Sequence, residues 1–245
     1  MPDTTEHNRG TATADALEPP LSEKQGAVAM KGARLSYPTP EGEIEVLQGV
    51  DLVVTPGEIV AVTGPSGSGK SSLIAVIGGL EVPSGGTTCV LGLDMMTAGE
   101  QARTRLRRRD IGVVFQSYHL VPAMTALQNV ALPLILAGES SAEDRAAALL
   151  KRVGLEHRLT HRPSALSGGE QQRVAIARAF VVGPRLILAD EPTGNLDQRT
   201  GQVVADTMFS LARDTGAAML LVTHDPALAD RCDRTVAIDG GRIVS

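Results

Sequence analysis

Positive charge and cysteine are both scarce in this sequence. Its 245 residues carry a formal net charge of -5, so nothing in the charge balance indicates a broad electrostatic contact with nucleic acid or anionic lipid. The two cysteines, Cys89 and Cys232, lack the paired spacing of a metal site. We interpret them as two reduced thiols, which is the usual state of cysteine in the cytosol.

Long apolar runs are missing as well. A helix that spans a bilayer needs ~18 or more consecutive apolar residues, and the best candidate, residues 130–137, is shorter and contains Pro133. The N-terminal stretch is polar and has no apolar segment of the kind found in secretory signals. We therefore expect no direct insertion into a membrane. A role at a membrane would require docking onto a partner that sits there.

What the sequence does contain is the pattern of a large α/β domain. Hydrophobic residues make up 42% of the chain and charged residues 21%, as in soluble globular proteins. Short apolar, β-branched runs at residues 58–63, 111–115, 186–189 and 218–223 alternate with helical stretches. This alternation predicts a mostly parallel sheet that is covered on both faces.

The chain is predicted to divide into a tail, a core and an insert. The tail is rich in Thr, Glu, Asp, Ala and Pro, which predicts disorder. An antiparallel β lead-in precedes the first parallel strand. The insert is helical, and Ser140 to Glu143 fit a capping box that begins one of its helices. The predicted bounds are 1–26 for the tail and 27–245 for the folded domain, with a core at about 27–116 and 183–245 and a helical subdomain at about 117–182.

A glycine-rich loop follows the apolar run at residues 58–63. Its sequence matches G-x-x-x-x-G-K-[ST], and a helical run at residues 72–77 comes next. Glycines let successive backbone N–H groups face one anion at a helix start, whose dipole adds partial positive charge. In this motif, Lys70 is expected to reach the β- and γ-phosphates of ATP, and the Ser71 hydroxyl to hold Mg²⁺. The predicted phosphate contacts are Gly64, Pro65, Ser66, Gly67, Ser68, Gly69, Lys70, Ser71 and Ser72.

Two adjacent carboxylates end another apolar run. Asp190 and Glu191 follow residues 186–189, so a parallel sheet would deliver both to its C-terminal edge, where ligands bind. Adjacent carboxylates repel each other. A bound Mg²⁺ removes this conflict if Asp190 orients the ion and leaves Glu191 free to polarise the attacking water. We predict Asp190 as a metal contact and Glu191 as the catalytic base.

A second glycine-rich helix start lies at residues 167–170. Ser167 and Glu170 have the spacing of a capping box. Gly168 and Gly169 fall in the first turn, where each glycine weakens a helix by roughly 1 kcal/mol relative to alanine. A plain cap does not need them, whereas close approach of a phosphate to the backbone does. We therefore predict Ser167, Gly168 and Gly169 as phosphate contacts.

Three further residues have two interpretations when each is taken alone. His224 follows the run at 218–223 at the edge that carries Asp190, so it is either a structural histidine or a contact of the γ-phosphate. Gln116 is either an ordinary surface residue or a link from metal or water to the helical insert. Tyr37 lies in a turn-prone stretch, where it either stacks on an adenine ring or is a partly exposed loop tyrosine.

Taken in order, these residues resemble the ATP-binding cassette (ABC) ATPases over about residues 27–245. The resemblance implies a P-loop NTPase core, with ATP and Mg²⁺ as ligands. It implies catalytic roles for Lys70, Gln116, Glu191 and His224, with Gln116 also contacting the metal. The corresponding motifs are Walker A at 64–71, the Q-loop at Gln116, the signature at 166–170, Walker B at 186–191, the D-loop with the nucleotide contact Asp197, the H-loop at His224 and the A-loop at Tyr37. One small departure is Glu170, where many members carry Gln.

Within that family, residues 161–170 and 189–197 resemble the group of LolD, MacB, FtsE and YbbA. Three secondary stretches, residues 138–143, 177–180 and 229–234, are most similar to the YbbA type. The resemblance implies two copies arranged head to tail around two ATP molecules. It also implies, as partner, an inner-membrane permease with a periplasmic domain. The protein would then act peripherally on the cytoplasmic side of the bacterial inner membrane, in export, extraction or mechanotransmission.

Two other functions are compatible with such motifs. One is an FtsE-like regulatory ATPase that signals through a membrane partner to a periplasmic enzyme without transport, and the residues that decide this lie in the partner. The other is a soluble ABC ATPase that acts on DNA or ribosomes. Such proteins usually carry a long coiled coil between the motifs, or two cassettes in one chain. This sequence has neither and lacks basic patches, so we expect no nucleic-acid partner.

Overall fold

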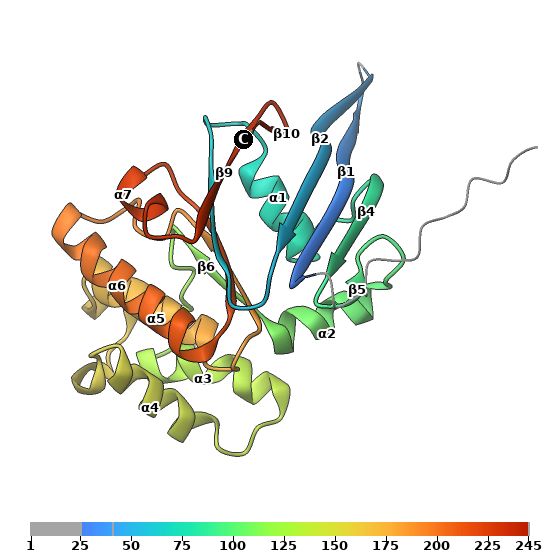
Figure 1. Ribbon diagram of the computed structural model, residues 1–245. Helices are drawn as coiled ribbons and strands as arrows, with labels where there is room; N and C mark the ends of the chain where they lie inside the picture. The colour runs from blue at the N-terminus through green and yellow to red at the C-terminus, as the bar shows by residue number, and fades with distance from the viewer. Residues whose placement is uncertain (1–25, 41, 245) are drawn as a thin grey trace, which may run out of the picture.

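The computed structural model describes residues 26–40 and 42–244 and contains two β-sheets with helices packed around them (Figure 1). The predicted tail lies outside the described residues except for Gly26. One sheet has four strands in the order β2-β1-β4-β5, and the other has six in the order β10-β9-β3-β8-β7-β6. The strands are β1 (Val28–Thr39), β2 (Gly42–Val54), β3 (Ile59–Thr63), β4 (Gly85–Val90), β5 (Leu93–Asp94), β6 (Ile111–Phe115), β7 (Leu186–Asp190), β8 (Ala218–Val222), β9 (Arg234–Asp239) and β10 (Arg242–Ile243).

The predicted parallel sheet is confirmed. Neighbouring strands from β9 through β3, β8 and β7 to β6 pair in parallel. The four apolar runs of the sequence coincide with β3, β6, β7 and β8 to within one residue at either end. The helices are α1 (Lys70–Ile77), α2 (Glu100–Asp110), α3 (Ala126–Ala137), α4 (Ala142–Arg152), α5 (Gly168–Phe180), α6 (Gln198–Thr215) and α7 (Pro226–Ala229), with short 3-10 helices η2 (Glu156–Arg158) and η3 (Pro163–Ala165).

Both faces of the six-stranded sheet are buried, which explains why its central strands are apolar throughout. Every residue of β8 is buried. Met219 and Leu221 pack on one face, whereas Leu220 and Val222 pack on the other, because side chains of a strand alternate in direction. The first face contacts buried residues of α3, α4, α5 and α6. The second contacts α1 and the four-stranded sheet.

The helical insert therefore shares one apolar core with a face of the main sheet. Its helix α5 lies close against β6. A Cβ at Gly112 in β6 would come within 2.3 Å of the Ala179 carbonyl oxygen of α5, so only glycine permits this approach. The division of the domain at residues 117 and 182 stays a prediction. The packing couples the insert directly to the strand that precedes Gln116.

The starts of two helices in the insert differ in how they are capped. At α3, the Thr125 hydroxyl accepts from the Gln128 N–H (3.2 Å), and the Gln128 side chain accepts from the Thr125 N–H (2.9 Å). The capping box predicted for Ser140 and Glu143 is wrong. Helix α4 begins one residue later, after Ser141, whose side chain makes no capping hydrogen bond. Burial of Ala142 and the other apolar residues of α4 sets where this helix starts.

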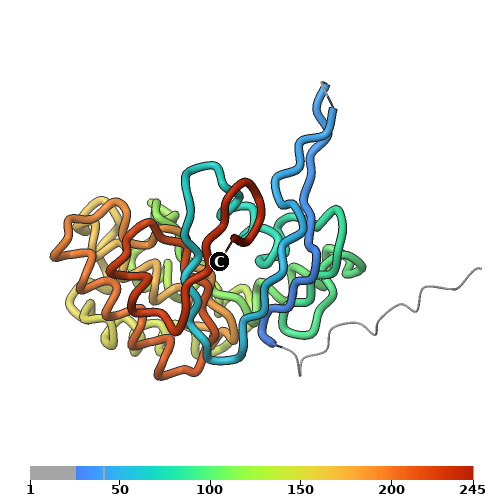
Figure 2. The backbone as a smooth tube through the Cα atoms, turned by 45° about the horizontal axis from the view of Figure 1, so that its top comes forward, coloured from blue at the N-terminus to red at the C-terminus, as the bar shows by residue number. Residues whose placement is uncertain are grey.

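Strands β1 and β2 form a long hairpin that projects from the body of the molecule (Figure 2). The prediction that Tyr37 lies in a turn-prone stretch is wrong. Tyr37 lies within β1 and pairs with Ile44 of β2, because the ladder continues to Thr39 opposite Gly42. Among the described residues, no helix combines the length and the apolar character that crossing a membrane requires.

Candidate active site

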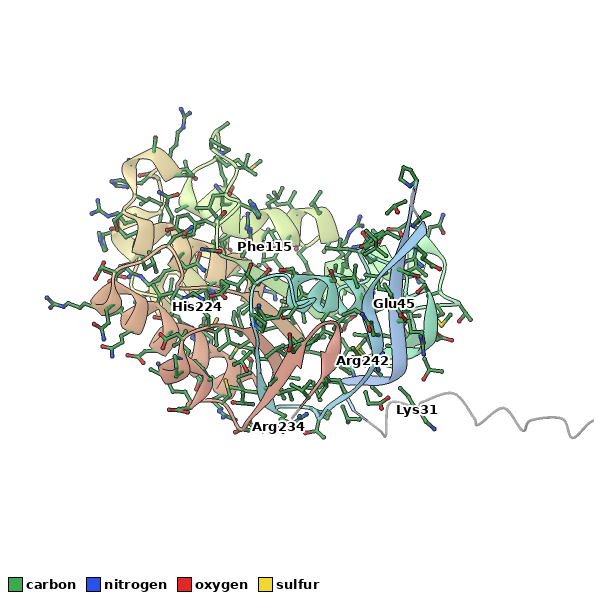
Figure 3. All side chains as sticks on the ribbon, turned by 90° about the horizontal axis from the view of Figure 1, so that it is seen from above. Lys31, Glu45, Phe115, His224, Arg234 and Arg242 are labelled. Atoms are coloured by element: carbon green, nitrogen blue, oxygen red, sulfur yellow. The ribbon has the colours of Figure 1, made fainter. Side chains whose placement is uncertain are left out.

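Four strands of the six-stranded sheet deliver polar side chains to one edge. Strands β3, β6, β7 and β8 run parallel, so the loops after them meet at the same edge. Figure 3 labels two residues there, Phe115 at the end of β6 and His224 after β8. The loops surround an open cavity of about 520 Å³. Its lining residues are Val46, Gly64, Ser66, Gly67, Gly69, Lys70, Ser71, Ser72, Gln116, Asp190, Glu191 and His224.

The loop between β3 and α1 has a backbone shape that requires glycine. Gly64 has a φ of 146°, and a Cβ there would lie 2.0 Å from the Ile238 carbonyl oxygen. The Lys70 ammonium donates to the carbonyl oxygens of Gly64 (2.9 Å) and Pro65 (2.7 Å), so it lies across the loop. The loop thus holds a cation beside the positive end of the α1 dipole. Ser68, also in the loop, is buried, and its hydroxyl has no partner among the described residues.

Ser71 and Asp190 are brought together from α1 and β7. The Ser71 hydroxyl donates to Oδ2 of Asp190 at 3.2 Å. Burial raises the pKa of Asp190, and the charge of Glu191 raises it further, while the Ser71 hydrogen bond and the Lys70 charge act in the opposite direction. Loss of solvation and a neighbouring anion therefore make the charged carboxylate unfavourable. A cation at this position would remove that cost.

Glu191 and His224 form a contact at the same edge. Nδ1 of His224 lies 2.6 Å from Oε2 of Glu191, and the exposed fractions of the two side chains are 72% and 19%. Glu191 has a φ of 47°, an unfavourable value for a residue with a side chain, and its N–H donates to the Val222 carbonyl oxygen at 3.0 Å. The backbone thus aims a half-buried carboxylate into the cavity. His224 is the exposed partner in this pair.

Gln116 reaches from β6 to the loop after β7. Its Nε2 donates to Oδ1 of Asn195 at 3.0 Å, and Nδ2 of Asn195 donates to the Gln116 carbonyl oxygen at 3.1 Å. Buried Gln172 of α5 adds a second connection, because its Nε2 donates to the carbonyl oxygens of Phe115 (3.2 Å) and Pro192 (2.6 Å). Hydrogen bonds from α5 therefore connect the loops around the cavity to the helical insert.

Ser167, the N-cap of α5, does not line the cavity that contains Lys70. The predicted capping box is confirmed. The Glu170 N–H donates to the Ser167 hydroxyl (3.3 Å), and Oε2 of Glu170 accepts from the Ser167 N–H (2.8 Å) and hydroxyl (2.9 Å). The same carboxylate accepts from Nε of Arg158 at 2.8 Å through its other oxygen. These bonds, with the Ser167 N–H making the largest contribution, lower the pKa of Glu170 to about 2.

The two glycines after Ser167 have a packing role within the chain. A Cβ at Gly169 would lie 2.3 Å from Cγ2 of Thr200 in α6, and one at Gly168 would lie 3.0 Å from the Tyr118 hydroxyl. Close contact with α6 and with the loop after Gln116 is therefore one reason for glycine here. Phosphate contact at these glycines remains a prediction.

Tyr37 and Asp197, two further predicted nucleotide contacts, also lie outside the Lys70 cavity. Burial, then the charge of Glu81 and a hydrogen bond to it, raise the pKa of Tyr37, so the phenol faces Glu81. Asp197 caps α6 by accepting from the Thr200 N–H at 3.1 Å. It lines a second cavity of about 510 Å³, which shares Glu191 and His224 with the first. The two cavities therefore meet at the Glu191–His224 pair.

Some residues that the structure places at these sites were not among the predicted contacts. Val46 of β2 lines the Lys70 cavity, Asn195 bonds with Gln116, and Arg158 pairs with Glu170. A role for Asn195 could have been predicted, because it lies between Gly194 and Asp197 in the D-loop motif. No sequence signal marked Val46 or Arg158, since their roles depend on strand pairing and on a fold of the insert that brings η2 to α5.

Comparisons with known proteins agree with this geometry. A family model described as "ABC transporter" matches residues 47–194. The ABC transporter ATP-binding protein YbbA of Escherichia coli K12 is 51% identical over 205 residues, which cover 83% of this chain and 90% of that protein. The lipoprotein-releasing system ATP-binding protein LolD of Ruegeria pomeroyi is 54% identical over 204 residues, covering 82% and 90%. A dimeric, post-hydrolysis structure of the ATP-binding cassette MJ0796 bound to ADP and Pi superposes with a TM-score of 0.82 and 38% identity, covering 89% of this chain and 97% of that one.

Proposed function

This chain belongs to the ABC transporter family, as an ATP-binding and ATP-hydrolysing subunit of the YbbA and LolD group, and from that premise we propose that two copies close head to tail around two ATP molecules. The observation that carries the proposal is the separation of Ser167 from the Lys70 cavity. Within one chain, the anion-binding starts of α1 and α5 cannot both contact one phosphate in this cavity, whereas those of two copies related by a two-fold axis can. The solved relative MJ0796 is itself a dimer.

In this proposal, the loop from Gly64 to Ser72 holds the triphosphate of its own copy. The Lys70 ammonium exchanges its two carbonyl contacts for phosphate oxygens, which bear more charge and bind it more strongly. Tyr37 stacks on the adenine ring after its phenol leaves Glu81. The partner copy supplies Ser167, Gly168 and Gly169 to the γ-phosphate and Asp197 to the edge of the pocket.

The residues around Asp190 fit a magnesium ion. Hydroxyl and carboxylate oxygens are the ligands that Mg²⁺ prefers, and Ser71 and Asp190 present one of each within 3.2 Å of one another. We propose these two residues and Gln116 as its protein contacts. When bound, the ion offsets the negative charge of the phosphates. Asp190 in turn becomes favourable in its ionised form, because the cation compensates for its burial.

We propose Glu191 as the general base for hydrolysis. Its carboxylate would accept the proton of the water that attacks the γ-phosphate. His224 holds Oε2 of Glu191 through Nδ1, which leaves the other oxygen for the water. As an exposed side chain, His224 can also turn toward the γ-phosphate when the copies close. Hydrolysis then removes the anion that both copies share, and the pair loosens.

The composite pocket is tested by introducing a negative charge at position 167 with a residue that is itself a good helix N-cap. We expect Ser167→Asp to abolish ATP-driven dimerisation and ATP hydrolysis, because a carboxylate would face the γ-phosphate. Aspartate and asparagine are both good N-caps of the same size, so Ser167→Asn is the neutral control and should retain more activity. Sedimentation measures dimerisation, and nucleotide titration should show unchanged ATP binding to single chains. Equal activity of the two variants would contradict a pocket closed by the partner's Ser167.

We further propose that α2 and α3 bind an integral membrane permease with a periplasmic domain, which places the subunit on the cytoplasmic side of the bacterial inner membrane. A cleft of about 340 Å³ between α2, β6, α3 and α5 is lined by apolar residues that include Ile111, Leu132 and Leu136. Arg108 of α2 lines this cleft and two adjoining ones. It is exposed and pairs with no carboxylate in residues 26–40 or 42–244. An apolar helix that carries acidic residues fits such a surface.

We expect the double variant Arg108→Glu, Leu136→Glu to lose co-purification with its permease from detergent-solubilised membranes. Leu136 is 60% exposed, so the change should leave the fold and ATP binding intact. Lys151→Glu, a charge reversal at an exposed position of α4, serves as control. A double variant that still co-purifies at the level of the control would place the permease elsewhere. Identification of the partner also distinguishes a transporter or mechanotransmission complex from an FtsE-like regulatory complex.

A further inference from the structure

Glu170 lies at the centre of a chain of contacts that runs from the start of α5 to η2 and His161. One carboxylate oxygen accepts both hydrogen bonds from Ser167, and the other accepts from Nε of Arg158 at 2.8 Å. The exposed fractions of the Arg158 and Glu170 side chains are 34% and 14%, so this ion pair is screened less by water than a surface pair. The Glu170 carboxylate is thus bonded directly to the Ser167 hydroxyl.

An acidic residue in this place conflicts with a role in anion binding. The pKa of Glu170 is about 2, so its carboxylate is ionised at neutral pH. A phosphate that approaches the Ser167 hydroxyl therefore approaches a second negative charge directly behind it, and like charges at such range repel. Arg158 is the cation that pairs with Glu170. Arg173 lies beside Gly169, but among the described residues its side chain makes no ion pair with Glu170.

The orientation of Arg158 is fixed by a second contact. Its Nη1 lies 3.3 Å from Nε2 of His161. A guanidinium can only donate, so Nε2 of His161 is the acceptor in this contact. The backbone of His161 is in turn anchored, because its carbonyl oxygen accepts from the Ala126 N–H of α3 at 2.8 Å and its N–H donates to the Arg158 carbonyl oxygen at 2.9 Å. The guanidinium is therefore held against Glu170 by the helical insert.

We propose that Arg158 is a positioning residue of the composite pocket, whose guanidinium offsets the charge of Glu170 so that the start of α5 can accept the γ-phosphate bound by the partner copy. This inference rests on the proposed head-to-tail dimer. It deepens that proposal by assigning to η2 a residue that acts on the phosphate through Glu170 and Ser167, without contact of its own. The glutamate at this position thus has its own counter-charge within the chain.

The test is a double-mutant cycle in the full chain. We expect Arg158→Gln to lower kcat/KM for ATP and ATP-driven dimerisation by about tenfold or more, because it leaves the Glu170 charge uncompensated. Binding of ATP to single chains should be unchanged. Glu170→Gln removes the charge and keeps a side-chain oxygen for the Ser167 N–H. The double variant Arg158→Gln, Glu170→Gln should therefore recover from the Arg158→Gln level to that of Glu170→Gln alone.

A purely structural role of Arg158 gives a different pattern, because the double variant then loses as much activity and dimerisation as Arg158→Gln, or more. That result would overturn the proposal, and so would an Arg158→Gln variant that matches the wild type. Arg152→Gln, which breaks an exposed ion pair between α4 and Asp214, is the matched arginine control. If the proposed head-to-tail dimer were itself wrong, Ser167→Asp would retain full activity, so the two proposals can be contradicted separately.

Discussion

Replacing Glu191 with glutamine is expected to lower the rate of ATP hydrolysis by about 10²–10⁴-fold, the usual contribution of a general base. The carboxylate would lose its ability to accept a proton, while the side chain keeps its size and its contact with His224. Phosphate release measures the rate. Since none of the proposed triphosphate contacts changes, we expect ATP binding to persist and the ATP-bound dimer to accumulate in sedimentation.

The control for this variant is Glu143→Gln, which removes a carboxylate from an exposed position in the first turn of α4. It should hydrolyse ATP at the wild-type rate. A Glu191→Gln variant that also turned over near the wild-type rate would exclude Glu191 as the base. A variant that lost ATP binding as well would instead assign Glu191 to nucleotide binding and would contradict its proposed role as the base.

The parallel sheet of this chain could be predicted well because its central strands are buried on both faces. Such strands have no alternation to obscure them, and each appears as a short apolar run that ends in a polar residue. Asp190, the last residue of β7, shows why the site followed from the same pattern. Once β7 is recognised as a parallel strand, the carboxylate at its end must lie at the edge of the sheet where the loop before Lys70 also lies.

Contacts between distant segments could not be predicted in this way. Tyr37 faces Glu81, which precedes another strand of the same sheet, and Arg158 reaches Glu170 only because the insert folds back on α5. The capping box at Ser140 failed for a related reason. Two adjacent serines offered equivalent caps, and burial of Ala142 against the core, which the local sequence does not contain, decided where α4 begins.

Replacing Lys70 with alanine is expected to lower the affinity for ATP by at least about 100-fold. Hydrogen bonds to charged groups contribute about 1.5–3 kcal/mol each, and the ammonium would make two or more to the phosphates. The fold should persist, because the hydrogen bonds that the Lys70 ammonium makes to described residues go to the carbonyl oxygens of Gly64 and Pro65, in an open cavity. Nucleotide titration measures the loss directly.

Thermal unfolding provides a second measure of the Lys70→Ala effect. A ligand that binds only the folded state at about 100 times its Kd stabilises it by about 2.7 kcal/mol. ATP at such a concentration should raise the Tm of the wild type and of Lys151→Ala, which truncates an exposed lysine of α4. It should leave the Tm of Lys70→Ala almost unchanged. If ATP stabilised all three proteins equally, the triphosphate would have to bind without the Lys70 ammonium, and the loop after β3 would lose its assignment as the phosphate site.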